Sequence, residues 1–207
     1  MKPAPTPKNE QRRLEVLWQY DVLDTVPEEV FDDLTQLASL ICQAPISTLT
    51  LVDEHRQWFK SKVGLSLAET SRDISFCGHA MLHNGLFIVP DALKDPRFRD
   101  NPFVTAEPHI RFYAGAPLIS PDGHPLGSLC VIDKVPRELT DDQKKALRVL
   151  GRHVITLLEL RRRAIASRQR RSEPDPVEQK PAVANRQPAP ARRAAPRRAP
   201  KARRQRR

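Results

Sequence analysis

RFYAGAPLISPDGHPLGSLCVID, residues 111–133, gives the clearest indication of the fold. Two apolar runs flank Asp122-Gly123, a pair that tolerates the positive φ angles of a tight hairpin turn. The second run, LGSLCVI, has apolar residues at odd and even positions, which is typical of a central strand covered on both faces. Gly115 and Gly127 leave gaps in these strands and indicate that other atoms approach the backbone closely. The stretch therefore predicts a buried β-hairpin.

The residues before this hairpin predict a second hairpin and two helices. PISTLTLVD and RQWFKSKVG, residues 45–53 and 56–64, are rich in β-branched and aromatic residues and predict two paired strands. Of the two helices that precede them, the second is marked by a capping box, Thr25-Val26-Pro27-Glu28. Its apolar positions, Val30, Leu34, Leu37 and Ile41 with Phe31 and Ala38 alongside, are expected to form a wide buried stripe.

A long helix is predicted after the central hairpin. It begins at a second capping box, residues 140–143. Apolar residues then recur with the spacing of a coiled-coil seam, at Leu147, Leu150, Val154 and Leu157. This seam predicts a homodimer through the helix, and the alternative is that all of these residues belong to the domain's own core. Helices at both ends of an antiparallel sheet give an α+β domain.

Residues from about 10 to 163 resemble the GAF domains found at the front of bacterial sensor kinases and diguanylate cyclases. The matching blocks, in family order, are LDTVPEEVFDDLTQLA, APISTLTLVDEHRQWFKS, SFCGHA, DPRFRDNPFV, IRFYAGAPL, GHPLGSLCVID and PRELTDDQ. The resemblance implies a six-stranded antiparallel sheet with terminal helices on one face and a ligand pocket on the other. Pockets of the family take cyclic nucleotides, tetrapyrroles and other small molecules, so the fold does not name the ligand or cofactor. The NKFDE-type motif of the cyclic-nucleotide-binding subgroup is absent from the sequence.

Charge divides the chain into a body and a basic tail. The whole chain carries a net charge of +10, whereas residues 164–207 alone carry +11. This tail is rich in proline and poor in large apolar residues, so we expect it to be disordered. The predicted organisation is therefore a disordered segment 1–8, a GAF domain over residues 9–163 and the tail. Residues 191–207 are expected to bind nucleic acid or another polyanion without sequence preference, and the alternative is a solvated tail without a partner.

Two further features bear on where the protein is found. No apolar run approaches the roughly 20 residues of a membrane-spanning helix, so we do not expect an integral membrane protein. Three cysteines at wide spacing give no disulfide framework. The expected location is the cytoplasm, with free thiols.

Five residues form the predicted ligand site: Cys77, His79, Asp91, Arg111 and Tyr113. Cys77 lies in the first turn of an expected helix, where its thiol is either reactive or simply a small buried group. Arg111 and Tyr113 alternate along the central strand, so both should face the pocket, where Arg111 would pair with an anion. The alternative is a structural ion pair between Arg111 and an acid such as Asp91. No metal site is predicted.

The leading functional hypothesis is a non-enzymatic sensory module that binds a small molecule and signals through its terminal helices and a homodimer. A second hypothesis is a ligand-free dimerisation platform that presents the basic tail. A third is a free methionine-(R)-sulfoxide reductase, because Cys77-Gly78 with Ala80 resembles the Cys-Gly-x-Ala stretch of that GAF family. The further active-site cysteines of that family are not matched in this sequence, and thiol catalysis needs a second cysteine.

Overall fold

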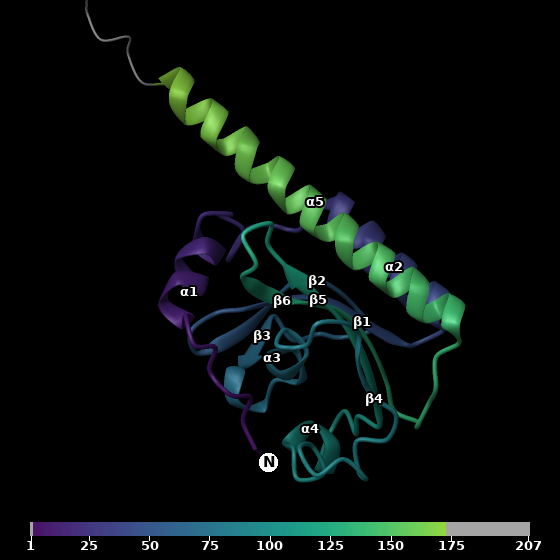
Figure 1. The fold of residues 1–207 in the computed structure, drawn as a ribbon. Coiled ribbons are helices and arrows are strands. Elements are labelled where there is room, and N and C mark those ends of the chain that lie inside the picture. Colours follow the sequence, from purple (N-terminus) through teal and green to yellow (C-terminus); the bar gives the residue numbers. More distant parts are fainter. Residues whose placement is uncertain (1, 173–207) are drawn as a thin grey trace, which may run out of the picture. The chain divides into compact units, whose positions relative to one another are not determined.

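An antiparallel six-stranded sheet forms the centre of the fold in the computed structural model, which describes residues 2–172 (Figure 1). The elements in chain order are α1 (Glu10–Trp18), α2 (Glu29–Cys42), β1 (Ile46–Val52), β2 (Arg56–Val63), β3 (Glu69–Ser71), a 3-10 turn (Arg72–Ile74), α3 (Phe76–Ala80), β4 (Phe87–Val89), α4 (Pro102–Thr105), β5 (Phe112–Ile119), β6 (Pro125–Asp133) and α5 (Asp141–Ser172). The strand order is β3-β2-β1-β6-β5-β4. The predicted α+β fold with a six-stranded antiparallel sheet is confirmed.

The hairpin of β5 and β6 lies in the middle of this sheet, as its sequence predicts. The two strands pair antiparallel from Phe112 opposite Asp133 to Ile119 opposite Pro125, and Gly123 adopts a φ of 82° in the turn. On its other side β6 pairs with β1, so it is covered on both edges. Its residues after Pro125 are all buried, which explains the apolar residues on both faces of the run.

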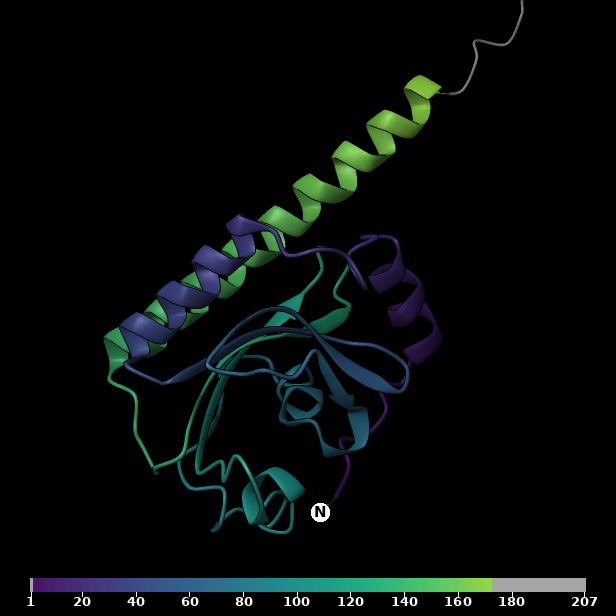
Figure 2. The ribbon, with the colours of Figure 1, turned by 180° about the vertical axis from the view of Figure 1, so that it is seen from behind.

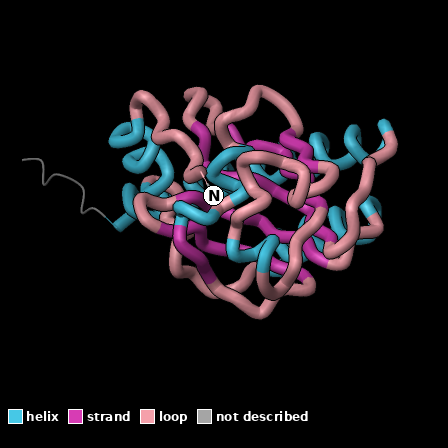
Figure 3. Tube along the Cα trace, turned by 90° about the horizontal axis from the view of Figure 1, so that it is seen from below, coloured by secondary structure: helices cyan, strands magenta, loops and turns pink. Residues whose placement is uncertain are grey.

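The sheet separates two apolar clusters. Helices α2 and α5 lie side by side against one face, where Leu129 and Val131 of β6 point (Figures 1 and 2). Cys130 and Ile132, which alternate with them, point to the opposite face beneath α3. Loops and short helices cover much of that face when the molecule is viewed from below (Figure 3). The face with α3 is therefore the one where a pocket can form.

Helix α5 uses its predicted coiled-coil seam inside its own domain. Leu147, Leu150 and Val154 are buried in the core cluster beneath the helix, and Leu157 packs against the same cluster. A helix laid on a sheet needs the same spacing of apolar residues as a helix paired with another helix. These side chains are buried in the core of their own domain, so a second copy of the chain cannot contact them. Dimerisation stays a prediction, and it would have to use other residues.

Helix α2 buries only part of the wide apolar stripe that its sequence predicted. Phe31, Ala38 and Cys42 are buried, whereas Val30, Leu37 and Ile41 are 41–76% exposed with their neighbours Leu40 and Val26. The predicted capping box also fails, since the helix is preceded by Glu28 and has no side-chain cap. Thr25 instead donates a hydrogen bond to the carbonyl of Val22 and accepts one from Lys60. An apolar stripe on the exposed face of α2 is left without a partner in the described chain.

The ends of the chain differ from the predicted boundaries. Helix α5 continues to Ser172, past the predicted domain end at residue 163, and residues 173–207 lie outside the described part of the chain. The predicted polyanion-binding segment, residues 191–207, is among them and stays a prediction. At the other end, residues 2–8 run past α3, where the Lys2 carbonyl lies 3.2 Å from Nε2 of His79.

Candidate ligand pocket

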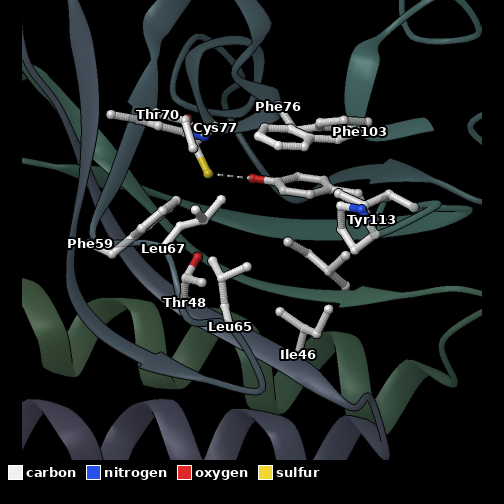
Figure 4. Close-up of a pocket in the computed structure, with 14 residues that line it drawn as sticks. Ile46, Thr48, Phe59, Leu65, Leu67, Thr70, Phe76, Cys77, Phe103 and Tyr113 are labelled. Atoms are coloured by element: carbon white, nitrogen blue, oxygen red, sulfur yellow. Dashed lines mark hydrogen bonds between the residues drawn. The ribbon is translucent and has the colours of Figure 1, made fainter. Parts of the chain in front are cut away.

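A small cavity lies between the sheet and α3, on the face opposite the long helices (Figure 4). Its volume is about 40 Å³. The residues that line it come from β1, β2, the loop after β2, β3, α3, α4, the segment before β5, β5 and β6: Ile46, Thr48, Gln57, Phe59, Leu65, Leu67, Thr70, Phe76, Cys77, Phe103, Pro108, Ile110, Tyr113 and Ile132. The cavity therefore lies on the face of the sheet where the resemblance to GAF domains implies a ligand pocket.

The size and lining of the cavity restrict what can enter it. A cavity of roughly 10–15 Å³ holds one water molecule, so this cavity has room for a ligand of only a few heavy atoms. None of its lining side chains is an acid, a lysine or an arginine, and most of them are aliphatic or aromatic. An ion in such a place would lose its hydration without gaining a counter-charge. The cavity therefore suits a small, uncharged molecule.

Helix α3 places Cys77 at this cavity. The hydroxyl of Ser75 caps the helix by accepting a hydrogen bond of 2.8 Å from the amide of Gly78. The same hydroxyl donates to Oε1 of Gln57 on β2. These two hydrogen bonds join the first turn of α3 to the sheet and fix the direction in which Cys77 points.

A buried polar cluster surrounds the Cys77 thiol. The hydroxyl of Tyr113 donates a hydrogen bond of 3.4 Å to Sγ of Cys77, the contact drawn in Figure 4. The same hydroxyl lies 3.0 Å from Oγ of Ser128. Sγ of Cys130 lies 3.9 Å from Sγ of Cys77, and Oγ1 of Thr48 lies 3.0 Å from Sγ of Cys130. All five side chains are buried, so water does not compete for these contacts.

Gly115 makes room for this cluster. A Cβ atom at Gly115 would lie 2.5 Å from the hydroxyl oxygen of Tyr113, which is closer than nonbonded atoms approach. The close approach that the sequence predicted at this glycine is therefore that of a side chain belonging to the pocket.

The cluster changes the acidity of its members. Burial raises the pKa of the Cys77 thiol, but hydrogen bonds with Cys130, Ser128, Thr50 and Tyr113 together outweigh burial and lower its pKa to about 6. Burial raises the pKa of Tyr113 and of Cys130, so both groups keep their protons and remain donors. Cys77 is therefore the member of the cluster that ionises most readily.

Of the five predicted site residues, the structure brings only Cys77 and Tyr113 to the cavity. Arg111 lies just before β5, and its guanidinium donates to the carbonyls of Val104 and Ile110 instead of facing the cavity. Strand alternation does not extend to a residue outside the strand, so Arg111 and Tyr113 do not share a face.

His79 and Asp91 also lie away from the cavity. The ring of His79 is buried between Lys2 and the ring of Phe98, and burial lowers its pKa. Asp91 pairs with Lys94 across 3.1 Å. Within residues 2–172, no group of three His, Cys, Asp or Glu side chains is arranged to hold a metal ion.

Sequence reasoning missed several residues that form the cavity wall. Phe59 and Gln57 of β2 alternate toward it, and Leu65 and Leu67 close it from the following loop. The period of two along a strand, which places Gln57 and Phe59 on the same face of β2, was the available signal. The loop residues gave none, because their role depends on contacts between segments that are distant in the sequence.

The sequence matches the GAF domain family over residues 26–158, more than half of the chain. The chain therefore belongs to the GAF domain family, whose members serve as sensory modules. Two solved structures agree in fold. The GAF domain of an Acinetobacter phosphoenolpyruvate-protein phosphotransferase is 16% identical, with a TM-score of 0.54 and coverage of 75% of this chain and 98% of that one. A free methionine-R-sulfoxide reductase of Neisseria meningitidis, solved with its substrate, is 18% identical, with a TM-score of 0.54 and coverage of 79% and 99%.

A more similar relative is known among curated proteins. The chain is 47% identical over 137 residues to a cyclic di-GMP phosphodiesterase of Pseudomonas aeruginosa. The match covers 66% of this chain and 23% of that enzyme, so the chain spans about a quarter of its relative's length. The prediction of a non-enzymatic protein is contradicted by this relative, whose name points to an enzyme. In the described residues, we find no helix with both the length and the apolar composition to cross a membrane.

Proposed function

We propose that this chain is a sensory GAF domain that binds a small, uncharged molecule and regulates the degradation of cyclic di-GMP. The observation that carries the proposal is the cavity of about 40 Å³, lined by apolar groups and a buried hydroxyl and thiol cluster. The connection to cyclic di-GMP is supported by the name of the 47%-identical relative. Cys77 and Tyr113 are the proposed ligand contacts, since they combine hydrogen-bonding groups with a place in the cavity wall.

Cyclic di-GMP itself does not fit the cavity as a ligand. The dinucleotide carries two phosphates, and the lining offers no cationic side chain to pair with them. It is also far larger than a space for a few heavy atoms. In this proposal the dinucleotide is the substrate of the regulated activity, and the ligand of the pocket is a different, smaller molecule.

Strand β2 supplies a route from the cavity to α5. Phe59 lines the cavity, and the next residue, Lys60, points to the helix face, where its ammonium donates to the Glu28 carboxylate across 2.7 Å. Arg161 of α5 donates to the same carboxylate oxygen across 2.6 Å. A ligand that shifts β2 would therefore move the buried Lys60 ammonium, which is linked through Glu28 to Arg161 of α5. Helix α5, whose last turns extend beyond the sheet, is the proposed output element (Figure 1).

The proposal is tested by nuclear magnetic resonance of the labelled full chain under xenon, a small uncharged probe of apolar cavities. We expect amide shifts at Cys77, Tyr113 and Ile110, with smaller shifts that reach Arg161. Ile132→Phe fills the cavity from the sheet and should abolish them, whereas Ile119→Phe, on the exposed end of β5, should not. Cyclic di-GMP should leave these amides unshifted. Shifts confined to the open groove around His83 and Arg148 would contradict the proposal.

We further propose that the domain dimerises through the exposed stripe of α2. Val30, Leu37 and Ile41 follow the spacing of a coiled-coil seam, with Leu34 half-buried between them. Apolar side chains with this spacing fit a second helix of the same kind, and two copies of one stripe can pair around a two-fold axis. The partner that would cover the stripe in this proposal is therefore a second copy of this chain.

Replacing Leu37 and Ile41 together by Glu should convert dimers into monomers, because two carboxylates would be buried against the partner's apolar residues. Light scattering at tens of micromolar measures the result. Gln36→Glu is the matched control, since Gln36 is an exposed polar residue of the same helix, and it should stay dimeric. A monomeric parent chain at this concentration would contradict the proposal.

A further inference from the structure

Two of the three cysteines meet inside the domain although more than fifty residues separate them in sequence. Sγ of Cys77 on α3 lies 3.9 Å from Sγ of Cys130 on β6, and both side chains are buried. A disulfide bond needs the sulfur atoms about 2 Å closer, a shift that side-chain rotation and a small movement of the short helix α3 can supply. The third cysteine, Cys42, lies in the cluster on the other face of the sheet.

The two thiols differ in their access to the cavity. Cys77 is part of the cavity wall, whereas Cys130 lies behind it and is not. Tyr113 donates a hydrogen bond to the Cys77 sulfur, which stabilises its thiolate, and Thr48 contacts the Cys130 sulfur. A molecule in the cavity therefore meets Cys77 first, with Cys130 in position to react second.

We propose that Cys77 and Cys130 form a reversible disulfide when hydrogen peroxide or a short alkyl hydroperoxide enters the cavity. These oxidants have the size and the lack of charge that the cavity requires, as its volume of about 40 Å³ and its uncharged lining show. The site is thus a redox modification site built on a pair of thiols, beyond the reversible ligand binding proposed above. The reversible ligand need not be an oxidant, so either proposal can fail without the other.

The chemistry proceeds in two balanced steps. The Cys77 thiolate attacks the terminal oxygen of the hydroperoxide, so that an S–O bond forms and the O–O bond breaks. The alkoxide or hydroxide that leaves takes up the proton that the Cys77 thiol released, and Cys77 becomes a sulfenic acid. The Cys130 sulfur then attacks the Cys77 sulfur, so that an S–S bond forms and the S–O bond breaks. The hydroxide leaves as water with the proton from Cys130.

Each sulfur gives up one electron, and the two electrons reduce the peroxide. An alkyl hydroperoxide yields one alcohol and one water, and hydrogen peroxide yields two waters. Return to the dithiol needs two electrons from a dithiol reductant. In the oxidised form a covalent bond joins α3 to β6 across the cavity wall. We expect the cavity, and with it the ligand affinity, to differ between the two forms.

The test treats the reduced, folded full chain with hydrogen peroxide and then counts free thiols after unfolding. We expect the count to fall from three to one, with a single disulfide-linked peptide pair that contains Cys77 and Cys130. Dithiothreitol should restore all three thiols. This experiment uses the parent chain alone, so its result does not depend on whether a variant folds.

Variants then assign the roles. Cys130→Ser should leave Cys77 as a sulfenic acid that dimedone traps, and Cys77→Ser should leave Cys130 reduced. Cys42→Ser is the matched control, since Cys42 is also buried but faces the other cluster, and the disulfide should form in it as in the parent. Three free thiols in the parent chain after peroxide treatment, or a disulfide that contains Cys42, would overturn the inference. If xenon still enters the cavity in that case, the proposed ligand binding stands.

Discussion

Gly127→Ala should destabilise the domain by about 3 kcal/mol, because it places a methyl group inside the backbone of the neighbouring strand. A Cβ atom at Gly127 would lie 2.0 Å from the carbonyl oxygen of Thr50 and 2.9 Å from Cα of Leu51. Backbone atoms in the middle of a sheet cannot move aside as a flexible side chain can. Strands β1 and β6 would have to separate at the centre of the fold, where they pair from Ile46 to Leu51.

Thermal unfolding measures this effect, and a loss of this size lowers the melting temperature by roughly 6–12 °C for a domain of this length. Gly85→Ala is the matched control, because a Cβ atom there would meet no atom within 4 Å. We expect that control to change stability by less than about 0.5 kcal/mol. Equal stability of the two variants would show that β1 and β6 do not pack as described.

Glu28→Ala should destabilise the domain by a similar amount, about 3 kcal/mol, because it removes the counter-charge of a buried ammonium. The side chain of Lys60 is 0% exposed and donates to Glu28, to Oγ1 of Thr25 and to the carbonyl of Val26. Without the carboxylate, a charged lysine would remain in the interior beside neutral acceptors. Arg161 would lose the same partner, so α5 would also be released at this point.

The control for this prediction is Glu15→Ala, since Glu15 pairs with Arg12 on the surface of α1. That exposed pair should contribute less than about 1 kcal/mol. Adding Lys60→Met to Glu28→Ala should restore part of the lost stability, because the unpaired charge is then gone. Urea unfolding of the four proteins decides the matter. A Glu28→Ala variant as stable as Glu15→Ala would rule out the buried charge network as a link between β2 and α5.

The two capping boxes show how far local sequence signals reach. At the start of α5, Thr140 and Gln143 exchange both hydrogen bonds of the predicted box. At the start of α2, Thr25 has the same kind of sequence around it but serves as an acceptor for Lys60. A buried ammonium needs several acceptors, and this tertiary demand outweighs a local cap. Nothing near Thr25 in the sequence identifies its partner, which lies more than thirty residues away.

Helix α2 illustrates a second limit. Its sequence is apolar on two faces, one with Phe31, Ala38 and Cys42 and the other with Val30, Leu37 and Ile41. Helical periodicity shows that a helix forms, but it does not say which of two apolar faces meets the sheet. The central hairpin carried no such ambiguity, because the Asp-Gly turn fixes its register and both of its faces are buried.

The pocket was predictable in position but only partly in composition. Its place followed from the resemblance to GAF domains, and Cys77 and Tyr113 were singled out as reactive or hydrogen-bonding residues. The contact between Cys77 and Cys130 was not visible, because it depends on how α3 lies over β6. Arg111 was expected at the wall for its charge, yet the structure uses that charge to bind the carbonyls of Val104 and Ile110.

We have proposed that the face of the sheet opposite α2 and α5 holds a cavity for a small, uncharged ligand. The most direct measurement is a crystal structure of the reduced protein under xenon pressure, which locates the probe atom by its electron density. We expect xenon between Cys77, Tyr113 and Ile132, with Arg111 outside its contact distance. Xenon found only between the sheet and the long helices, or only in the open groove beside Arg148, would contradict it.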